Sequence, residues 1–286
     1  MTTRVEIVAL PGPIGVEVRG VDASRPLDDE TASALDRALD DRHLLLLRGR
    51  DLDGAEQVRW CRNFGPIAPE GPGGDGLVSN ADPGGVLREG ALPFHSDFAF
   101  TETPVDRLSL HALQVPPDGA PTVYADAVCI LERVPRALRA RLEGCTVVNV
   151  YDFTLPTDRR MRERDLAPGS PVVERPMVDR HRRTGAPLIT ANAMHTDRVA
   201  DVSEDESEAL LTEVFGHLYA PDNTLVLEWE VGDLVVWDNL ALQHHRPDFP
   251  TTEPRTMQRV CVNEKSGHEL VPNMAELVAG ATRTYG

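Results

Sequence analysis

Short stretches of hydrophobic residues recur along much of the chain with the spacing typical of β-strands. In the segment 43–48 four leucines follow one another without interruption, which indicates a buried strand. Other stretches alternate between hydrophobic and polar residues, as strands do when one face lies in the core. These patterns predict strands at residues 5–10, 16–18, 43–48, 108–115, 223–230, 233–237 and 257–262.

Four other segments have the spacing of an amphipathic helix. In residues 27–41, Leu35 and Leu39 share one face and acidic residues occupy the opposite face. Ser203 is followed three residues later by Glu206, which is the capping-box pattern of a helix start. We therefore expect helices at residues 27–41, 54–64, 131–142 and 203–219, the third with Pro135 near its start.

Two segments lack either pattern. Residues 66–95 are rich in glycine and proline and predict a long exposed connection, and residues 152–171 are charged and contain prolines. Many strands with long insertions are typical of a β-sandwich or jelly roll with helices packed outside. We expect one domain spanning residues 1–286, with lid-like insertions around 66–94 and 152–171.

Composition and charge narrow the functional classes. The chain has 286 residues, of which 41% are hydrophobic, so it can bury a sizeable core. Its formal net charge of -17 argues against binding to nucleic acid or to an anionic membrane surface. No apolar run reaches membrane-spanning length, and the four cysteines form no CxxC pair. We expect a cytoplasmic protein with a small-molecule partner, and the sequence leaves a homo-oligomer open.

One tripeptide has the character of an iron site. Iron that must bind oxygen needs few protein ligands and several open positions, and two histidines with one carboxylate meet that need. His95 and Asp97 are two residues apart, so in an extended chain their side chains share a face. A third ligand should come from a distant strand, and His244 lies just beyond the hydrophobic segment 233–237. The neighbouring His245 would then point to the opposite face.

The same pattern occurs a second time, at His195 and Asp197. Only one of the two pairs can be the metal site. The second pair directly precedes the helix at 203–219 and is not followed by a suitable further ligand. We therefore favour the first pair, which is followed in order by Thr122, His244 and Arg255.

Several motifs in order along nearly the whole chain resemble the taurine dioxygenase and 2,4-dichlorophenoxyacetate dioxygenase (TauD/TfdA) family of iron(II)- and 2-oxoglutarate-dependent oxygenases. The resemblance implies a mainly β fold with flanking helices, the cupin-like double-stranded β-helix or jelly roll. The motifs that carry it are residues 15–22, the turn at 63–65, and residues 94–97, 115–122, 201–204 and 232–244, followed by Arg255 and Arg259.

The resemblance also implies roles for individual residues. His95, Asp97 and His244 match the iron ligands of the family. Thr122 and Arg255 match the residues that bind the distal carboxylate of 2-oxoglutarate, which agrees with the affinity of a guanidinium for carboxylates. Iron(II) and the cosubstrates 2-oxoglutarate and O2 are therefore the expected cofactors.

The substrate side of the resemblance is less complete. Arg259 matches the position that reaches the substrate anion in the taurine enzyme, although an ion pair that supports the cosubstrate is an equal alternative. Asn80 and His195 fall where related enzymes have pocket residues; the alternatives are a turn cap for Asn80 and a surface position for His195. Ala68 stands about where the taurine enzyme has a substrate-contacting histidine. We therefore expect a small anionic substrate other than taurine.

The expected reaction is oxidation of a substrate C–H bond, with hydroxylation as the default and with release of succinate and CO2. Natural-product tailoring and catabolism are both compatible roles. Two rival classes remain at this stage. A hydrolase or isomerase with a non-redox metal on a β-barrel would need the three ligands but not Thr122 and Arg255. A catalytically silent binding protein of the same fold would form no succinate.

Overall fold

The larger of two facing sheets contains eight of the described strands. The computed structural model describes residues 5–70, 75–82, 90–117, 119–250 and 252–277. All strand pairs of this sheet are antiparallel except β2 with β3. Its order is β1 (Glu6–Ala9), β2 (Val16–Arg19), β3 (Leu44–Leu47), β15 (Leu234–Asp238), β7 (Arg107–Gln114), β17 (Thr256–Val262) and β4 (Ile67–Ala68), and β5 (Asp75–Ser79) also pairs with β17.

The smaller sheet faces the larger one and contains the strands that matter most for function. Its order is β14 (Thr224–Leu227), β8 (Thr122–Asp126), β16 (Leu242–Arg246) and β6 (Leu92–His95). The hydrophobic core between the sheets includes Leu46, Tyr124, Trp237 and Leu242. Two facing antiparallel sheets with helices outside form the predicted jelly-roll arrangement.

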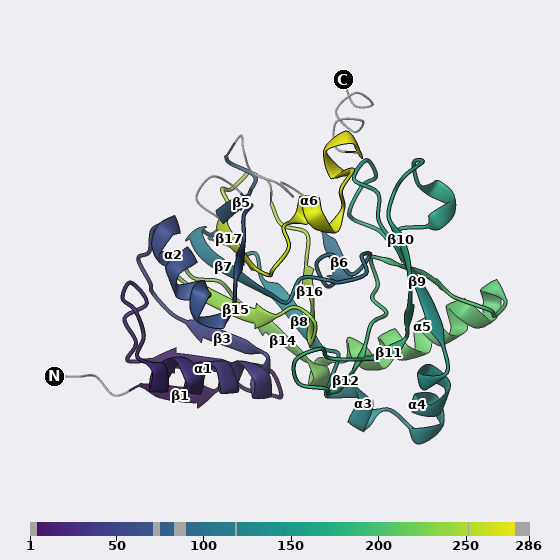
Figure 1. Cartoon of the computed structure of the whole chain (residues 1–286), viewed down its shortest axis with the longest axis horizontal. Helices are drawn as coiled ribbons and strands as arrows, with labels where there is room; N and C mark the ends of the chain where they lie inside the picture. Colours follow the sequence, from purple (N-terminus) through teal and green to yellow (C-terminus); the bar gives the residue numbers. More distant parts are fainter. Residues whose placement is uncertain (1–4, 71–74, 83–89, 118, 251, 278–286) are drawn as a thin grey trace.

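The position of strand β3 between two hydrophobic layers explains why its sequence is uniformly hydrophobic. Leu44 and Leu46 point into the core between the sheets, whereas Leu45 and Leu47 point to the outer face of the larger sheet. Helices α1 (Asp29–Arg42) and α2 (Gly54–Cys61) cover that outer face, at the left of Figure 1. Both faces of the strand are therefore buried, which a run of leucines satisfies.

A third group of elements packs beside the smaller sheet, at the right of Figure 1, around its own hydrophobic cluster. Helix α6 (Gly267–Leu270) lies near the end of the described chain. Among the described residues no helix is long and apolar enough to cross a membrane. The group comprises β9 (Thr146–Val150), β10 (Val172–Pro176), β11 (Val178–Arg180), β12 (Pro187–Ile189), β13 (Thr196–Val199), α3 (Ile130–Arg133), α4 (Arg136–Glu143) and α5 (Glu204–Leu218), and short 3-10 helices occur at Arg62–Phe64, Glu163–Asp165 and Pro221–Asn223.

The predicted strands and helices are confirmed at most positions, including the capping box of Ser203 and Glu206. The single helix expected at 131–142 is wrong, because the chain breaks into α3 and α4. Val134 has an extended backbone with ψ of 148°. A proline disfavours the helical conformation of the residue before it, and Pro135 follows Val134 directly.

The long exposed connection expected at 66–95 is also wrong in part. This range contains strands β4, β5 and β6, of which β4 and β5 pair with β17 in the larger sheet. Residues 71–74 and 83–89 of the expected insertion lie outside the described residues. The range 152–171 has little regular structure apart from the 3-10 helix Glu163–Asp165. Its role as a lid remains a prediction.

Candidate metal and cosubstrate site

Two histidines face each other across the smaller sheet. Strands β6 and β16 are antiparallel, and His95 is the direct cross-strand partner of His244. Directly opposite residues of an antiparallel pair have their side chains on the same face and close together. The two imidazole rings accordingly lie with their centroids 4.2 Å apart. Residues separated by 149 positions thus meet because of strand register.

Asp97 joins the two histidines from a turn and not, as the sequence suggested, from an extended strand. Strand β6 ends at His95, and the turn that follows includes Phe98 with a positive φ of 60°. Asn239 holds this turn: its Oδ1 accepts a hydrogen bond from the Asp97 backbone N–H at 2.9 Å, and its Nδ2 donates to the Asp97 carbonyl at 3.0 Å.

The three side chains form a compact donor set. Asp97 Oδ1 lies 3.3 Å from His95 Nε2 and 3.6 Å from His244 Nε2. One ligand atom from each residue lies within 4.8 Å of the other two. Two imidazole nitrogens and one carboxylate oxygen are the donors that suit a non-haem iron with open positions. The set therefore fits an iron(II) ion.

Protonation also favours metal binding. His95 Nδ1 lies 2.8 Å from the Pro93 carbonyl, a contact that places the proton on Nδ1 and leaves the Nε2 lone pair facing Asp97. Burial lowers the pKa of His244 to about 3, so its imidazole is neutral. Burial would raise the pKa of Asp97, but Arg259, His95 and His244 outweigh it and hold the pKa well below its usual range. A neutral imidazole at His244 and an ionised carboxylate at Asp97 are the forms in which these groups bind a metal.

A small cavity of about 50 Å³ adjoins the three residues and is lined by Thr122 and Arg255 among others. The Thr122 hydroxyl accepts a hydrogen bond from Trp229 Nε1 at 3.0 Å. Arg255 is buried, and burial together with nearby Arg246 lowers its pKa to about 9. Among the described residues, no carboxylate influences the Arg255 guanidinium, which lies 5.7 Å from the Phe249 ring centroid and whose Nε has no hydrogen-bond partner. A buried cation without an anion fits a site for the carboxylate of a cosubstrate.

A second arginine of this cavity was missed by the sequence analysis. Arg246 lines the same cavity as Arg255 and Thr122, and its guanidinium donates to the Gly90 carbonyl at 2.8 Å. The signal was available in the sequence, because Arg246 lies two residues beyond His244 on the same strand. Residues two apart in a strand share a face, so a ligand at His244 implies that Arg246 points toward the site.

A larger cavity of about 430 Å³ is also lined by His95 and Asp97. One wall is hydrophobic and aromatic, with Phe100, Tyr151 and Phe153 in mutual ring contact. His195 lies in this cavity, against Phe100 and Tyr151, and burial keeps its pKa well below the usual value. The structure thus places His195 beside the space where a substrate would lie.

The side chain of Asn80 contacts the segment that leads into β17. It does not line either cavity, and both of its side-chain groups bond to the segment leading into β17. Its Oδ1 accepts from the Arg255 backbone N–H at 2.8 Å, and its Nδ2 donates to the Glu253 carbonyl at 2.9 Å. These bonds hold the backbone at Arg255, and a contact between Asn80 and substrate remains a prediction.

Arg259 reaches the site from the larger sheet. Its Nη2 lies 2.9 Å from Asp97 Oδ2 and 3.1 Å from Glu70 Oε1. Burial would lower the pKa of Arg259, but Glu70 and Asp97 raise it, so the guanidinium is held as a cation. Burial raises the pKa of Glu70, and Arg259 opposes that rise. The sequence analysis did not identify Glu70.

The second His-x-Asp pair does not form a comparable donor set among the described residues. His195 faces the larger cavity, whereas Asp197 pairs with arginines at a separate surface. Asp197 Oδ2 accepts from Arg198 at 2.8 Å, and Oδ1 lies 3.7 Å from Arg162. The two side chains thus point to different parts of the molecule.

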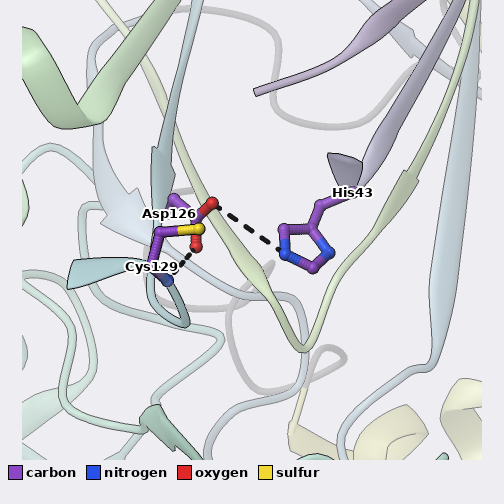
Figure 2. A group of neighbouring side chains, drawn as sticks. All are labelled: His43, Asp126 and Cys129. Carbon is purple, nitrogen blue, oxygen red and sulfur yellow. Dashed lines mark hydrogen bonds and ion pairs between the residues drawn. The ribbon is translucent and has the colours of Figure 1, made fainter. Parts of the chain in front are cut away.

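One further group of possible ligands, His43, Asp126 and Cys129, lies near the ends of strands β3 and β8 and is drawn in Figure 2. His43 Nε2 lies 3.9 Å from Asp126 Oδ2, and Cys129 lies on the turn after β8. Asp126 Oδ1 accepts from the backbone N–H groups of Val128 and Cys129 at 2.8 Å each, which closes this turn. The residues do not line either cavity, and we interpret the group as a structural contact between the sheets.

Comparison with known proteins agrees with this geometry. The family described as taurine catabolism dioxygenase TauD, TfdA family matches residues 6–261. Pentalenolactone F synthase of Streptomyces arenae is 27% identical, covering 90% of this chain and 94% of its own length. The α-ketoglutarate-dependent sulfate ester dioxygenase of Pseudomonas putida is also 27% identical, covering 90% and 88%. The α-ketoglutarate-dependent 2,4-dichlorophenoxyacetate dioxygenase of Cupriavidus pinatubonensis is 26% identical, covering 85% and 92%.

Solved structures share the fold. A taurine dioxygenase from Burkholderia xenovorans superimposes with a TM-score of 0.75 at 24% identity, covering 90% of each chain. AAD-2 in complex with Mn(II) and N-oxalylglycine superimposes with a TM-score of 0.77 at 24% identity, covering 91% of this chain and 97% of that protein. These likenesses confirm the predicted jelly-roll fold.

Proposed function

The chain belongs to the TauD/TfdA family of iron(II)- and 2-oxoglutarate-dependent dioxygenases, and from that premise we propose which of its residues hold the metal and the cosubstrate. His95, Asp97 and His244 bind iron(II). Thr122 and Arg255 bind the distal carboxylate of 2-oxoglutarate, and Arg246 and Arg259 also line the same cavity. The rival classes of hydrolase, isomerase and silent binding protein are not favoured, because the relatives that match are dioxygenases.

The observation that carries the assignment is the juxtaposition of the donor set with Arg255, a buried arginine that has no carboxylate partner among the described residues. The small cavity is lined at once by His95, Asp97 and His244 and by Arg255. A carboxylate bound to Arg255 would satisfy its charge, and the keto-acid end of the same molecule would then lie toward the three ligands. A site built only for a non-redox metal has no need of this arginine.

With iron(II), 2-oxoglutarate and O2 bound, the site supplies the oxidation of a substrate C–H bond, most simply a hydroxylation, with formation of succinate and CO2. The protein positions the metal ligands and the reactants and excludes water from the site. The Pro93 carbonyl holds the His95 tautomer, and Asn239 holds the turn that carries Asp97. Asn80 holds the backbone of Arg255. The larger cavity has an aromatic wall around Phe100.

The substrate is a small molecule and occupies the larger cavity beside His95 and Asp97. The names of the relatives indicate sulfate esters and 2,4-dichlorophenoxyacetate as substrates of those enzymes. His195 is our candidate for a substrate contact, since it lines the cavity without a partner for its Nδ1 among the described residues. We also expect a cytoplasmic enzyme, because all four cysteines are free.

The assignment is tested by succinate formation from 2-oxoglutarate under oxygen, measured by chromatography with a panel of small organic substrates. Wild-type protein with iron(II) should form succinate, and protein freed of metal should not. If succinate does not form with any substrate although iron(II) and 2-oxoglutarate both bind, the assignment as a turnover-competent site is contradicted.

A further inference from the structure

Glu70 stands directly in front of the arginine that was expected to receive a substrate anion. Strand β4 pairs with β17 so that Ala68 lies opposite Cys261. Strand β4 ends at Ala68, and β5 then takes over the pairing with β17, where Gly76 lies opposite Arg259. Glu70 lies two residues beyond β4, and its carboxylate lies 3.1 Å from the Arg259 guanidinium.

The surroundings keep the Glu70 side chain at this place. Gly76 of β5 is the cross-strand partner of Arg259, and a Cβ at Gly76 would meet the Glu70 Cβ at 3.4 Å. The side chains of Glu70 and Arg259 are only 22% and 15% exposed. Both residues line the larger cavity, so the ion pair is part of the wall that a substrate would meet.

This pairing changes the charge that the cavity presents. Arg259 contacts two carboxylates, those of Glu70 and Asp97. An acidic substrate group placed at Arg259 would become a third anion there, close to Glu70. In a partly buried site such like-charge contacts are strongly unfavourable, because water screens them poorly. Selectivity often comes from a repulsive element of this kind as well as from attractive contacts.

The rest of the larger cavity is suited to a hydrophobic molecule. Its lining includes the aromatic group Phe100, Tyr151 and Phe153, together with Phe98 and Met194. An ionised carboxylate can only accept hydrogen bonds, so Glu70 would pair with a donor such as a hydroxyl or an ammonium group.

We propose that Glu70 determines substrate class by excluding acids at Arg259 and accepting a hydrogen bond from a hydrophobic substrate that carries a hydroxyl or amine. This inference rests on the proposed function, because it assumes that the larger cavity holds the substrate beside the iron site. It competes with the expectation from the sequence that the substrate is an anion bound by Arg259.

The test uses three probes with one carbon skeleton and different head groups: phenylpropylamine, phenylpropanol and phenylpropanoate. Binding is measured by calorimetry under nitrogen, with protein loaded with iron(II) and 2-oxoglutarate. In the wild type, the amine or the alcohol should bind at least about tenfold more tightly than the acid. In Glu70→Gln, which keeps the shape and removes the charge, this preference should fall below about twofold or reverse.

Asp75→Asn is the matched control. Asp75 lies on the neighbouring strand β5, accepts a hydrogen bond from Gln258 at 2.7 Å and does not line the cavity. The Asp75→Asn substitution also removes one negative charge, and the variant should keep the head-group preference of the wild type. The inference is overturned if the wild type binds the acid as tightly as the other probes, or if Glu70→Gln keeps the wild-type preference.

A separate measurement distinguishes this failure from a failure of the proposed function. Iron(II) and 2-oxoglutarate affinities are measured first in the wild type and in both variants. Absence of either affinity in the wild type contradicts the proposed function itself. Normal affinities without a change of head-group preference contradict only the role of Glu70.

Discussion

The tripeptide pattern His-x-Asp occurs twice in this protein, in two different structural environments. At residues 95–97 the histidine ends a strand and faces His244 across the sheet, and the aspartate turns toward both imidazoles. At residues 195–197 the histidine faces an aromatic wall, and the aspartate pairs with Arg162 and Arg198 at a separate surface.

The difference lies in what each segment contacts and not in its own sequence. The first pair has a cross-strand histidine and an asparagine that bonds to both backbone groups of Asp97. The second pair also has an asparagine, Asn192, but it accepts from the backbone N–H of His195 and leaves Asp197 to the arginines. A metal site thus requires a third ligand and a held carboxylate, and local pattern alone cannot supply them.

The largest difference between the two His-x-Asp pairs is expected when the carboxylate of each pair, Asp97 or Asp197, is removed. Asp97→Ala should abolish measurable iron(II) binding and succinate formation, because it removes one of the three proposed protein ligands. Asp197→Ala should bind iron as the wild type does. Iron content is measured after anaerobic loading and gel filtration. Loss of iron in Asp197→Ala with retention in Asp97→Ala would reverse the assignment of the two pairs.

Arginines near the two pairs should differ almost as strongly. Arg255→Ala should raise the dissociation constant of 2-oxoglutarate at least roughly thirtyfold, because truncating a partner of a buried charged group costs about 2 kcal/mol or more. Arg162→Ala removes an arginine beside Asp197 and should leave that constant unchanged. Calorimetric titration of iron-loaded protein measures both. Unchanged affinity in Arg255→Ala would remove Arg255 from the cosubstrate site.

The two asparagines provide a finer comparison. Asn239→Ala should weaken iron(II) binding about ten- to a hundredfold, because groups that orient a ligand contribute on that scale. Asn192→Ala, which frees the backbone of His195, should leave iron affinity near the wild-type value. Competition with a metal chelator measures both affinities. Equal losses in the two variants would mean that the hydrogen bonds of Asn239 stabilise the fold and not the site in particular.

His195 should show the smallest effect. His195→Ala is expected to retain iron and 2-oxoglutarate affinity and to weaken substrate saturation by roughly tenfold, since it removes one contact from the cavity wall. Steady-state succinate formation at varied substrate concentration measures the change. Loss of iron in this variant would instead return the second His-x-Asp pair to consideration as a ligand source.

Sequence reasoning succeeded where short-range physics decides the outcome. The leucine run of β3, the amphipathic helix α1 and the capping box of Ser203 depend on residues close in sequence, and each was predicted. The break at Pro135 is also a local effect. The prediction of one helix at 131–142 underestimated how strongly this proline interrupts a helix.

Features that depend on strand pairing were less accessible. Strands β4 and β5 lie in a glycine- and proline-rich range and are strands because β17 supplies their hydrogen bonds. Glu70 lies just beyond β4, and its contact with Arg259 of β17 joins residues that are far apart in the sequence. The family resemblance supplied the candidate ligands and Thr122. Arg246 could have been found from the two-residue period of a strand, but the segment Leu242–Arg246 was not predicted as a strand.

The central claim is that His95, Asp97 and His244 together hold the catalytic metal. The most direct test is a crystal structure of the protein loaded with Mn(II) in place of iron(II), with the ion located by its anomalous diffraction. The account predicts a single metal peak contacted by His95, Asp97 and His244. A peak at His195 and Asp197, or at His43, Asp126 and Cys129 with none at the predicted ligands, would contradict it.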